Sequence, residues 1–479
     1  MLSAEARRLF ARLAVFQGGW DAEGAAQVCL SREPSDSPQS PSREADGWSA
    51  FDLLERLLSE SLLIADERNG VMRFRMLETL REFAWEQLPP QEQERLLCRH
   101  ATYLMRFAEE IETKLDGPEL RDWLNRLEEE RANLTAALTW CVESQATEQS
   151  PSPAEIGLRI MGALWRFWDM RGSVREAREF TERLLERAPP ECAPKVFARA
   201  FNTAGTFAQA ESDYAAALAH FREALAQWRR AGSTVGVATI LGNMGTLYGD
   251  QANLEAALDC YTEGLAIVRE LAIPRRIATF LNNLGTLRNM MGDFDAAQDH
   301  LLEALALRKQ IGDRRAVFST LNNLAALAHY REDYAAAISG QEEALAIARE
   351  LEDRFAAAVS LVNLGNNYLS VKDYPACYRC FIESLQLHAA VGSRFGQAYA
   401  LEGLAVHAVS VALPERAGIL RGASQSLRES IQAVHAPREQ EILDAAFTSL
   451  AADPSFLVGL KRGKDLPLEA ALSVALRPL

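Results

Sequence analysis

The amino-acid sequence predicts an all-α protein, built mainly as a solenoid of about seven 40-residue helical hairpins that follow a small winged-helix-like domain. Two observations predict the solenoid. The sequence matches itself when it is shifted by 40 residues, and each block holds two amphipathic helical stretches. A third observation, a pair of short alternating segments on either side of Gly70, predicts the two-stranded wing of the N-terminal domain.

The composition excludes several classes of function. The chain has 479 residues, of which 48% are hydrophobic and 24% charged, and its formal net charge is −15. An acidic surface repels phosphate backbones, so we expect no nucleic-acid binding by this chain alone. The sequence shows neither a long apolar run nor a signal peptide, and its seven cysteines are scattered. We therefore expect a cytoplasmic protein that makes no membrane contact.

The elements expected at the N-terminus follow a winged-helix order. They are helices at 3–16, 21–29 and 51–63, a mobile Ser/Pro-rich insertion at 31–47, two strands around Arg68, Asn69 and Gly70, and a helix at 78–88 that Pro89 and Pro90 end. The expected domains are a winged-helix-like domain at 1–90, a helical linker at 91–150, the repeat array at 151–430 and a helical C-terminal cap at 431–479.

Columns of equivalent residues define the repeat. Seven blocks keep one register without a slip, and a mostly small residue follows a mostly large apolar one. The apolar column is Leu164, Ala204, Met244, Leu284, Leu324, Leu364 and Leu404, and the next column is Trp165, Gly205, Gly245, Gly285, Ala325, Gly365 and Ala405. A second small column is Ala177, Ala217, Ala257, Ala297, Ala337, Cys377 and Ala417.

Each block is predicted to be an antiparallel pair of helices. Asp, Ser and Gly fall in breaks such as 291–294 and 351–354, where they stop one helix and cap the next. Glycine or alanine at a crossing allows two backbones to approach, and large neighbours fill the surrounding grooves. One hairpin cannot bury its apolar face alone, so the hairpins are expected to stack. In the last block Pro414 and Arg421 replace apolar residues, which predicts a more polar outer face.

The repeat resembles the tetratricopeptide repeat (TPR). The residues that carry the resemblance are Leu364, Gly365, Tyr368, Tyr374 and Phe381, and Ala217, Phe221, Ala224 and Leu225. The usual TPR has about 34 residues, so a 40-residue block resembles the long-repeat variety of bacterial regulators. The resemblance implies that one face of each first helix lines a concave groove.

Several segments are similar to bacterial STAND-class signalling ATPases and large LuxR-type regulators. They are LFARLAVFQGGWDAEGAAQVC, LLERLLSESLL, FRMLETLREFA, DWLNRLEEERANLTAAL, LWRFWDMRG, RAGILRGASQSLRE and LPLEAALSVAL. Those relatives carry an upstream nucleotide-binding domain, and this chain is expected to lack it and to be the sensor arm. The resemblance implies a separate ATPase domain as one partner.

The segment nearest to a phosphate-binding loop is GLKRGKD at 459–465, which has three residues between its glycines and Asp465 in place of the hydroxyl residue. We interpret it as a surface turn, so no residue is assigned to a cofactor.

A DNA-reading helix is not expected at 51–60 either, because Asp52, Glu55 and Glu60 outnumber Arg56. Residues 1–90 carry 10 basic and 15 acidic side chains, which favours a packing or relay module.

No metal or catalytic site is predicted. Cys377 and Cys380 have no second pair nearby, and Cys377 falls in the small column, so we expect it to be a buried thiol. His220, Cys260, His300 and Cys380 share a column, but successive repeats hold equivalent residues about 10 Å apart. The sequence also lacks the common catalytic motifs, so we expect no enzyme and no catalytic residue.

Asparagines one place before the apolar column are the best candidate binding residues. The column holds Asn243, Asn283, Asn323 and Asn363, and Asn202, Asn282 and Asn322 lie beside it. Thr246, Thr286, Asn289 and His329 lie nearby on the same helices. An amide can donate to and accept from a peptide backbone at once. The alternative is that these amides bond neighbouring turns and stabilise the stack.

The sequence therefore predicts a non-catalytic scaffold or sensor that binds a protein, a peptide or a small effector in its groove. The alternative function is a LuxR-type transcriptional regulator whose DNA-binding and ATP-binding parts lie outside this chain.

Overall fold

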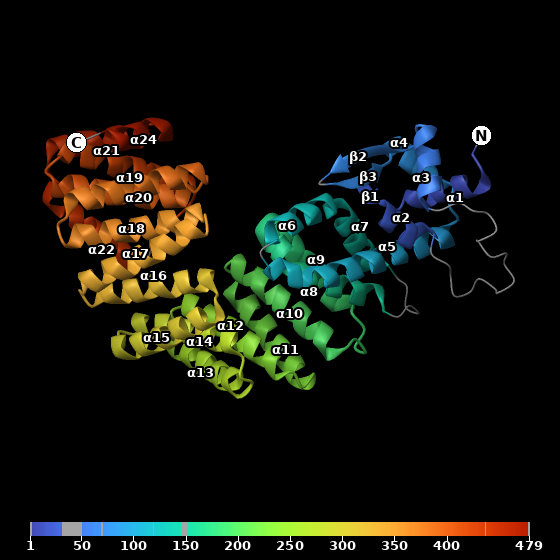
Figure 1. Ribbon diagram of the computed structural model, residues 1–479, viewed down its shortest axis with the longest axis horizontal. Helices are drawn as coiled ribbons and strands as arrows, with labels where there is room; N and C mark the ends of the chain where they lie inside the picture. The colour runs from blue at the N-terminus through green and yellow to red at the C-terminus, as the bar shows by residue number, and fades with distance from the viewer. Residues whose placement is uncertain are drawn as a thin grey trace. The chain divides into compact units, whose positions relative to one another are not determined.

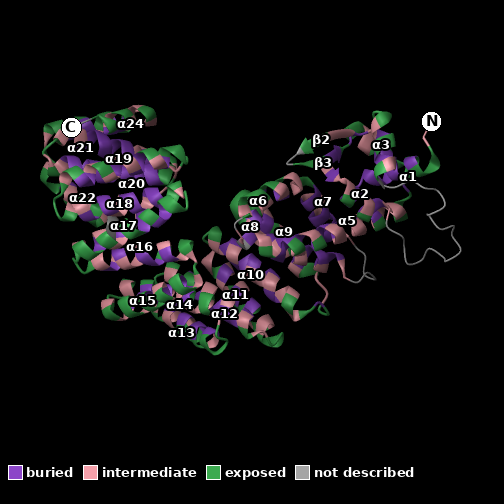
Figure 2. Cartoon of the chain, in the orientation of Figure 1, coloured by how far each residue is buried: buried purple, intermediate pink, exposed green. Residues whose placement is uncertain are grey.

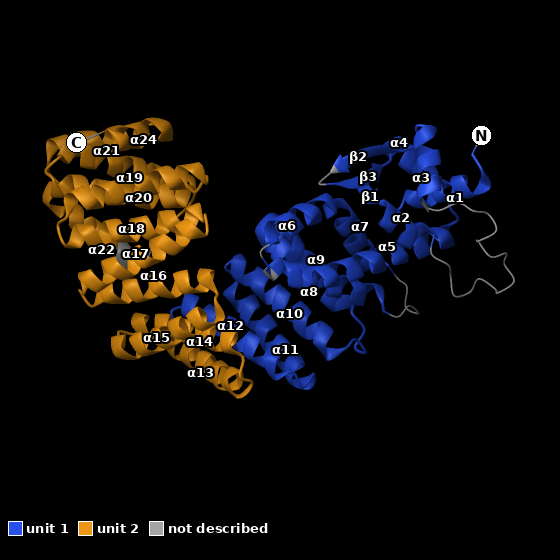
Figure 3. Ribbon diagram, in the orientation of Figure 1, with its two compact units in different colours: residues 1–253 blue, residues 254–479 orange. Residues whose placement is uncertain are grey.

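The computed structural model describes residues 2–30, 50–68, 70–117, 119–144, 151–435 and 437–477 (Figure 1). They form two compact units, residues 1–253 and residues 254–479 (Figure 3). Helices dominate both units, and the strands of the described residues all lie in the first one. Burial is concentrated between paired helices, while the turns are exposed (Figure 2).

The first unit begins with a small module of helices and strands. Its elements are α1 (Ala4–Leu13), β1 (Gly19–Asp21), α2 (Ala22–Ala25), a π-helical turn (Ala26–Leu30), α3 (Ala50–Ser59), β2 (Ile64–Arg68), β3 (Val71–Arg75) and α4 (Glu78–Glu86). The three strands form an antiparallel sheet in the order β1-β3-β2. Leu13, Trp20, Leu57 and Phe74 are buried in its core. The arrangement fits the expected winged-helix-like domain.

The sheet has one strand more than the sequence predicts. β1 pairs with β3, and Trp20 lies opposite Phe74. Three residues are too short for an alternating pattern to be recognised, which is why the strand was missed. The helix predicted at 21–29 is also broken, because α2 ends at Ala25 and a π-helical turn continues to Leu30. The predicted insertion at 31–47 and the turn residue Asn69 lie outside the described residues.

The rest of the first unit is helical. It comprises α5 (Pro90–Ile111), a 3-10 turn (Glu112–Asp116), α6 (Leu120–Glu129), α7 (Arg131–Glu143), α8 (Pro153–Arg171), α9 (Val174–Arg187), α10 (Pro194–Ala210), α11 (Tyr214–Arg230) and α12 (Thr234–Asp250). Leu138, Phe167, Trp168 and Phe207 are buried in a second core.

The second unit consists of helices throughout its described residues. They are α13 (Leu254–Glu270), α14 (Pro274–Met290), α15 (Phe294–Ile311), α16 (Arg314–Tyr330), α17 (Tyr334–Glu350), α18 (Arg354–Ser370), α19 (Tyr374–Ala390), α20 (Arg394–Ser410), α21 (Pro414–Ser430), α22 (Pro437–Phe447), a 3-10 turn (Thr448–Leu450), α23 (Pro454–Asp465) and α24 (Leu468–Leu476). The paired helices have 17 residues, or 18 in α15, which confirms the predicted hairpins.

The turns within the hairpins confirm the predicted caps. Asp333 precedes α17, and its carboxylate accepts a hydrogen bond from the Ala336 backbone N–H at 3.1 Å. The residue before each such aspartate is left-handed, with φ of 81° at Gly292 and 63° at Glu332. This pair of residues reverses the chain and satisfies an N–H of the first turn of the next helix.

Small residues lie where the two helices of a hairpin cross. A Cβ atom added to Gly285 would lie 2.5 Å from the Cγ of Leu301, and one added to Gly365 would lie 2.7 Å from the Phe381 ring. Ala297, on the opposing helix, has no exposed surface. The small columns therefore mark close backbone approach, as the sequence predicts.

Four glycines join α23 to α21 in a contact that we call the glycine clasp: Gly418, Gly422, Gly459 and Gly463. A Cβ atom on Gly463 would lie 2.1 Å from the Ile419 carbonyl oxygen. The interpretation of 459–465 as a surface turn is therefore wrong. Glycines four residues apart share one helix face and allow the two backbones to touch.

The polar outer face expected for the last hairpin is also absent at Arg421. This side chain is only 5% exposed, because α21 packs against α23 and α24 instead of facing solvent. Arg421, Ser424 and Arg428 of α21 thus lie inside a C-terminal helical cap.

The crossing of α14 and α15 gives the first testable prediction. Ala297→Leu adds three carbon atoms where the helices touch, so we expect it to lower the free energy of unfolding by about 1–3 kcal/mol. Urea unfolding measures this change. An unchanged midpoint would contradict the assigned crossing.

The glycine clasp gives a second prediction. Gly463→Ala places a methyl group against the α21 backbone, so we expect a loss of about 1–3 kcal/mol from overpacking. Gly249→Ala is the matched control, because Gly249 is helical and nothing lies within 4 Å of an added Cβ atom. The control should be neutral or stabilise by up to about 1 kcal/mol, and equal effects of the two substitutions would rule out the clasp.

Candidate functional site

The predicted asparagines lie at equivalent positions on the first helices of consecutive hairpins. These helices are α10, α12, α14, α16 and α18. The side chains of Asn202, Asn243, Asn283, Asn323 and Asn363 are all half-buried. We call Asn243, Asn283, Asn323 and Asn363 the ladder amides, and Asn202, Asn282 and Asn322 the base amides.

Ladder amides donate hydrogen bonds to base amides. In the first unit, the Asn243 Nδ2 donates to the Asn202 Oδ1 at 2.7 Å. In the second unit, the equivalent bonds run from Asn323 to Asn282 at 3.1 Å and from Asn363 to Asn322 at 2.9 Å. Each bond connects the first helices of consecutive hairpins and uses one N–H of the ladder amide.

Asn283 is the exception among the ladder amides. Within the described part of the chain its side chain makes no hydrogen bond. The position 41 residues earlier, where the other ladder amides find a base amide, is Gly242. Both N–H donors and the carbonyl oxygen of the Asn283 side chain are therefore unused among the described residues.

Two of the base amides also accept hydrogen bonds from the second helices. The Asn282 Oδ1 also accepts from the Arg308 Nη1 at 3.1 Å. The Arg308 side chain is 8% exposed, and it also donates to the Ala316 carbonyl oxygen at 2.9 Å. Burial lowers the pKa of Arg308 from its usual value. In the next hairpin the Gln341 Nε2 donates to the Asn322 Oδ1 at 3.0 Å.

This arrangement leaves a defined set of polar groups for a ligand. The carbonyl oxygens of Asn243, Asn323 and Asn363 have no partner among the described residues, and neither does the second N–H of each. Because a base amide holds each of these side chains, its free donor and acceptor are already oriented. Orientation before binding reduces the entropy lost when a ligand is held.

The other predicted residues lie on the same helices. Thr246 and Thr286 are exposed, and their hydroxyls donate to carbonyl oxygens one turn earlier, each at 3.1 Å. Asn289 is half-buried. His329 has its Nδ1 atom 2.6 Å from the Asn367 Oδ1, and its ring packs edge-on against Tyr334.

Sequence reasoning missed Asn367, which is 3% exposed. The signal was available, because Asn367 falls in the column of Leu247, Leu287 and Leu327, where an amide is out of place.

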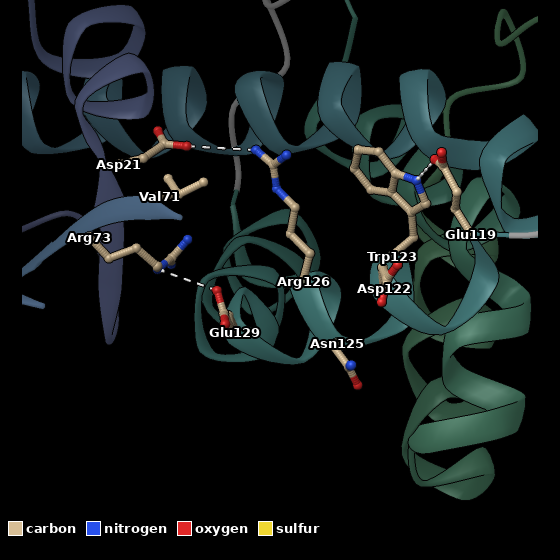
Figure 4. Close-up of a pocket in the computed structure, with 9 residues that line it drawn as sticks. All are labelled: Asp21, Val71, Arg73, Glu119, Asp122, Trp123, Asn125, Arg126 and Glu129. Carbon is tan, nitrogen blue, oxygen red and sulfur yellow. Dashed lines mark hydrogen bonds and ion pairs between the residues drawn. The ribbon is translucent and has the colours of Figure 1, made fainter. Parts of the chain in front are cut away.

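The first unit also contains a cavity of about 370 Å³ between the sheet and α6 (Figure 4). Four of its charged groups are paired: Arg126 lies 3.7 Å from Asp21, and Arg73 lies 3.8 Å from Glu129. The Trp123 indole donates to the Glu119 carboxylate at 3.2 Å. These pairs join the sheet of the module to α6, so they favour a packing role for this part of the cavity.

Asn133 anchors the N-terminal module to α7. This fully buried amide accepts from the Gln17 backbone N–H at 2.8 Å and donates to the Gly19 carbonyl oxygen at 2.8 Å. It also donates to Glu130, which receives the Arg73 guanidinium at 2.6 Å. A network of this kind favours the packing role that the acidic sequence of the module predicts.

His100 lies beside this network on α5. It is 1% exposed, and its ring packs edge-on against Phe16 with centroids 5.1 Å apart. Burial lowers the pKa of His100 from 6.5 to about 4, and a hydrogen bond with Asn133 opposes the shift.

The cysteine and histidine positions show packing contacts. Cys377 has no exposed surface, which confirms the predicted buried thiol, and burial raises its pKa to about 12. His220 bonds to Glu182, with 3.3 Å between the Nε2 and Oε1 atoms. Within the described ranges, no three His, Cys, Asp or Glu side chains are grouped to hold a metal ion. None of the described helices has the length and apolarity that a bilayer crossing requires.

Comparison with known proteins identifies the repeat. A family model described as "Tetratricopeptide repeat" matches residues 196–270 and 276–350. The repeat array is thus a TPR solenoid, and the small three-stranded module before it fits a winged-helix-like domain. TPR folds are typical of non-catalytic scaffolds.

The full fold is similar to a solved structure. The solved structure is that of a Signal Transduction ATPase with Numerous Domains (STAND) protein with a tetratricopeptide repeat sensor, from Pyrococcus horikoshii. The match has a TM-score of 0.61 and 17% sequence identity, and it covers 99% of this chain and 65% of that one. At this identity the likeness shows the fold alone.

Two curated relatives come from mycobacteria. Proteins of Mycobacterium bovis and of Mycobacterium tuberculosis strain H37Rv, both named as candidate HTH-type transcriptional regulators, are each 29% identical over 186 residues. The aligned region covers 39% of this chain and only 19% of each relative. The chain therefore matches about a fifth of the length of these proteins.

The burial of His100 gives a prediction about pH. Its pKa is lower in the folded protein, so the unfolded chain binds a proton first as the pH falls below 6.5, and stability is lost down to about pH 4. The expected loss between pH 8 and pH 5 is roughly 2 kcal/mol. Urea unfolding of His100→Leu should show a pH dependence that is smaller by this amount. The same pH dependence in both proteins would contradict the assignment.

Proposed function

We propose that this chain is a non-catalytic binding scaffold whose ladder amides hold an extended peptide or protein segment through its backbone. The observation that supports this proposal is the state of the amides in the second unit. They are half-buried, two of them are oriented by base amides, and each keeps an unused donor and acceptor. Peptide groups require this combination of donor and acceptor.

The spacing of the hairpins supports an extended ligand. Neighbouring helices lie about 8–10 Å apart, and an extended chain advances about 3.3 Å per residue. Consecutive ladder amides would therefore meet about every third peptide group. Recognition of this kind fixes the backbone and tolerates many side chains.

The structural alternative predicts different behaviour for the same residues. Hydrogen bonds between ladder and base amides also join consecutive hairpins, so Asn323 and Asn363 serve the stack in either case. Asn283 contributes no such bond among the described residues. Because Asn283 adds no hydrogen bond to the stack, this residue separates the two explanations.

The scaffold is proposed to be the sensor arm of a larger STAND-type signalling regulator. The likeness to the STAND protein with a tetratricopeptide repeat sensor supports this assignment. The partners would be a protein, a peptide or a small effector in the groove and a separate ATPase domain, in the cytoplasm. The proposed domains remain 1–90, 91–150, 151–430 and 431–479.

A second candidate function is transcriptional regulation of the LuxR type. The observation that favours it is the match to the two mycobacterial proteins named as candidate HTH-type regulators. DNA contacts would then come from parts outside this chain, because α3 carries Asp52 and Glu55 against Arg56, and another carboxylate, Glu60, follows directly after the helix.

The ladder gives a prediction that separates binding from stability. We expect Asn283→Ala to weaken binding of a peptide selected from a random library against the wild-type protein by about tenfold, as hydrogen bonds to an amide are lost. Its melting temperature should stay within about 1 °C of wild type, because no internal bond is removed. Asn323→Ala should weaken binding and also lower the melting temperature. Calorimetry measures both quantities.

Gln386→Ala is the matched control, since Gln386 is an exposed amide on the second helix α19. It should change neither quantity. A lower melting temperature with intact affinity in the Asn283→Ala, Asn323→Ala double variant would establish the structural role instead.

A further inference from the structure

The second unit holds a cavity of about 600 Å³ at its C-terminal end. It is lined by residues of α21, of the segment after α21, of α22 and of α23, among them Arg421, Gln425, Arg428, His435 and Lys464. Neither the ladder nor the base amides line this cavity, so it is separate from the proposed peptide site.

Two buried arginines of α21 line one wall of the cavity. Arg421 and Arg428 are each 5% exposed. Arg428 donates from its Nε and Nη2 atoms to the Glu402 carboxylate at 2.7 and 3.0 Å. Aromatic rings fix both guanidinium planes, with Tyr399 at 4.4 Å from Arg428 and Phe447 at 5.4 Å from Arg421.

The buried positive charge exceeds the buried negative charge. Glu402 is 4% exposed and already accepts from Arg428, from Ser424 at 2.6 Å and from His435 at 3.1 Å. Arg421 lies 3.8 Å from this carboxylate. Its other partner, Asp444 at 3.2 Å, has a side chain that is 61% exposed and therefore well screened by water. Burial accordingly lowers the pKa of Arg421 from its usual value.

Both guanidinium groups also have an unused donor. The Nη1 atoms of Arg421 and Arg428 are buried, and neither finds a hydrogen-bond acceptor among the described residues. The Oε1 atom of Gln425, which also lines the cavity, is buried without a partner as well. Buried polar groups without partners destabilise a fold, and charged donors do so most strongly.

We propose that this cavity binds a small oxyanion, a carboxylate or a phosphoryl group, between the guanidinium groups of Arg421 and Arg428 and the ammonium group of Lys464. Arginine forks match the two oxygens of such groups, and a lysine adds a mobile point charge. Glu429 also lines the cavity, but its side chain is exposed. A bound anion would supply the acceptors that the two Nη1 atoms lack.

An anion in this position would stabilise the helical cap. Arg421 and Arg428 lie on α21, and Lys464 lies on α23, which the glycine clasp holds against α21. A ligand that binds only the folded state raises the melting temperature in proportion to the logarithm of its concentration above the dissociation constant. Thermal unfolding of the full chain therefore reports on the site.

The experiment uses inorganic phosphate and succinate as probes, each against sodium chloride at equal ionic strength. We expect a saturable rise of the melting temperature with at least one of the two probes and none with chloride. Phosphate alone, succinate alone or both would each support the site and would identify the group that it accepts. Equal rises in all three salts would overturn the proposal.

Two matched variants separate site binding from general salt effects. Lys464→Gln removes the charge at the cavity and should weaken the apparent affinity for the probe by about tenfold. Arg462→Gln removes one charge from the same helix, but Arg462 is exposed, pairs with Glu415 and does not line the cavity. It should leave the affinity unchanged. Equal affinities in the two variants would exclude a role for Lys464 and refute the site as proposed.

Arg421→Lys tests the guanidinium fork while it retains the charge. We expect it to weaken probe binding in the folded protein, as judged by an unchanged circular dichroism spectrum. If this variant fails to fold, the comparison of Lys464→Gln with Arg462→Gln still decides the proposal.

Discussion

The close approach of two backbones at each hairpin crossing is the constraint on which the rest of the structure depends. Gly205 receives the Phe221 ring, Gly285 receives Leu301 and Gly365 receives Phe381, each at a separation that leaves no room for a Cβ atom. Because small residues recur at the crossings of the hairpins, the paired helices keep a constant spacing. That constancy brings residues 41 positions apart within hydrogen-bonding distance, as Asn323 and Asn282 show.

The sequence predicts the parts of the fold that repeat, and it fails on several of the parts that occur once. Seven copies of a column reveal which positions are small, so the crossings and the ladder amides are visible without coordinates. β1 is only three residues long, and a single Gly-x3-Gly spacing in 459–463 has no periodic context that would separate a helix face from a turn. The hydrogen-bond partners of the amides could not be predicted either. A column shows which residues are equivalent in successive repeats, but it does not show which residues of other columns they contact.

The same pair of positions carries different chemistry in the middle and at the end of the second unit. Arg308 bonds to Asn282, and 120 residues later Arg428 bonds to Glu402 at the equivalent positions. A neutral amide suffices for Arg308, which also donates to a backbone carbonyl of the next first helix. Arg428 has a carboxylate instead, which lowers the energy of its buried charge but must also serve Ser424 and His435. The last hairpin of the array thus has a buried ion pair at the positions where an earlier hairpin has an arginine and a neutral amide.

The two candidate sites therefore differ in whether their unused hydrogen-bonding groups are buried or accessible to water. In the ladder, the oxygens of Asn282 and Asn322 each accept two hydrogen bonds. The unused groups of the ladder amides belong to half-buried side chains that water can reach, so an empty groove has little energetic penalty. In the C-terminal cavity, the unused donors of Arg421 and Arg428 are buried. A fold tolerates unsatisfied buried donors only when other contacts offset their energetic cost. Here the glycine clasp and the aromatic rings that pack against both guanidinium groups provide those contacts. The ladder is consequently suited to transient binding of many segments, whereas the cavity is suited to one small anion whose binding is coupled to the stability of the cap.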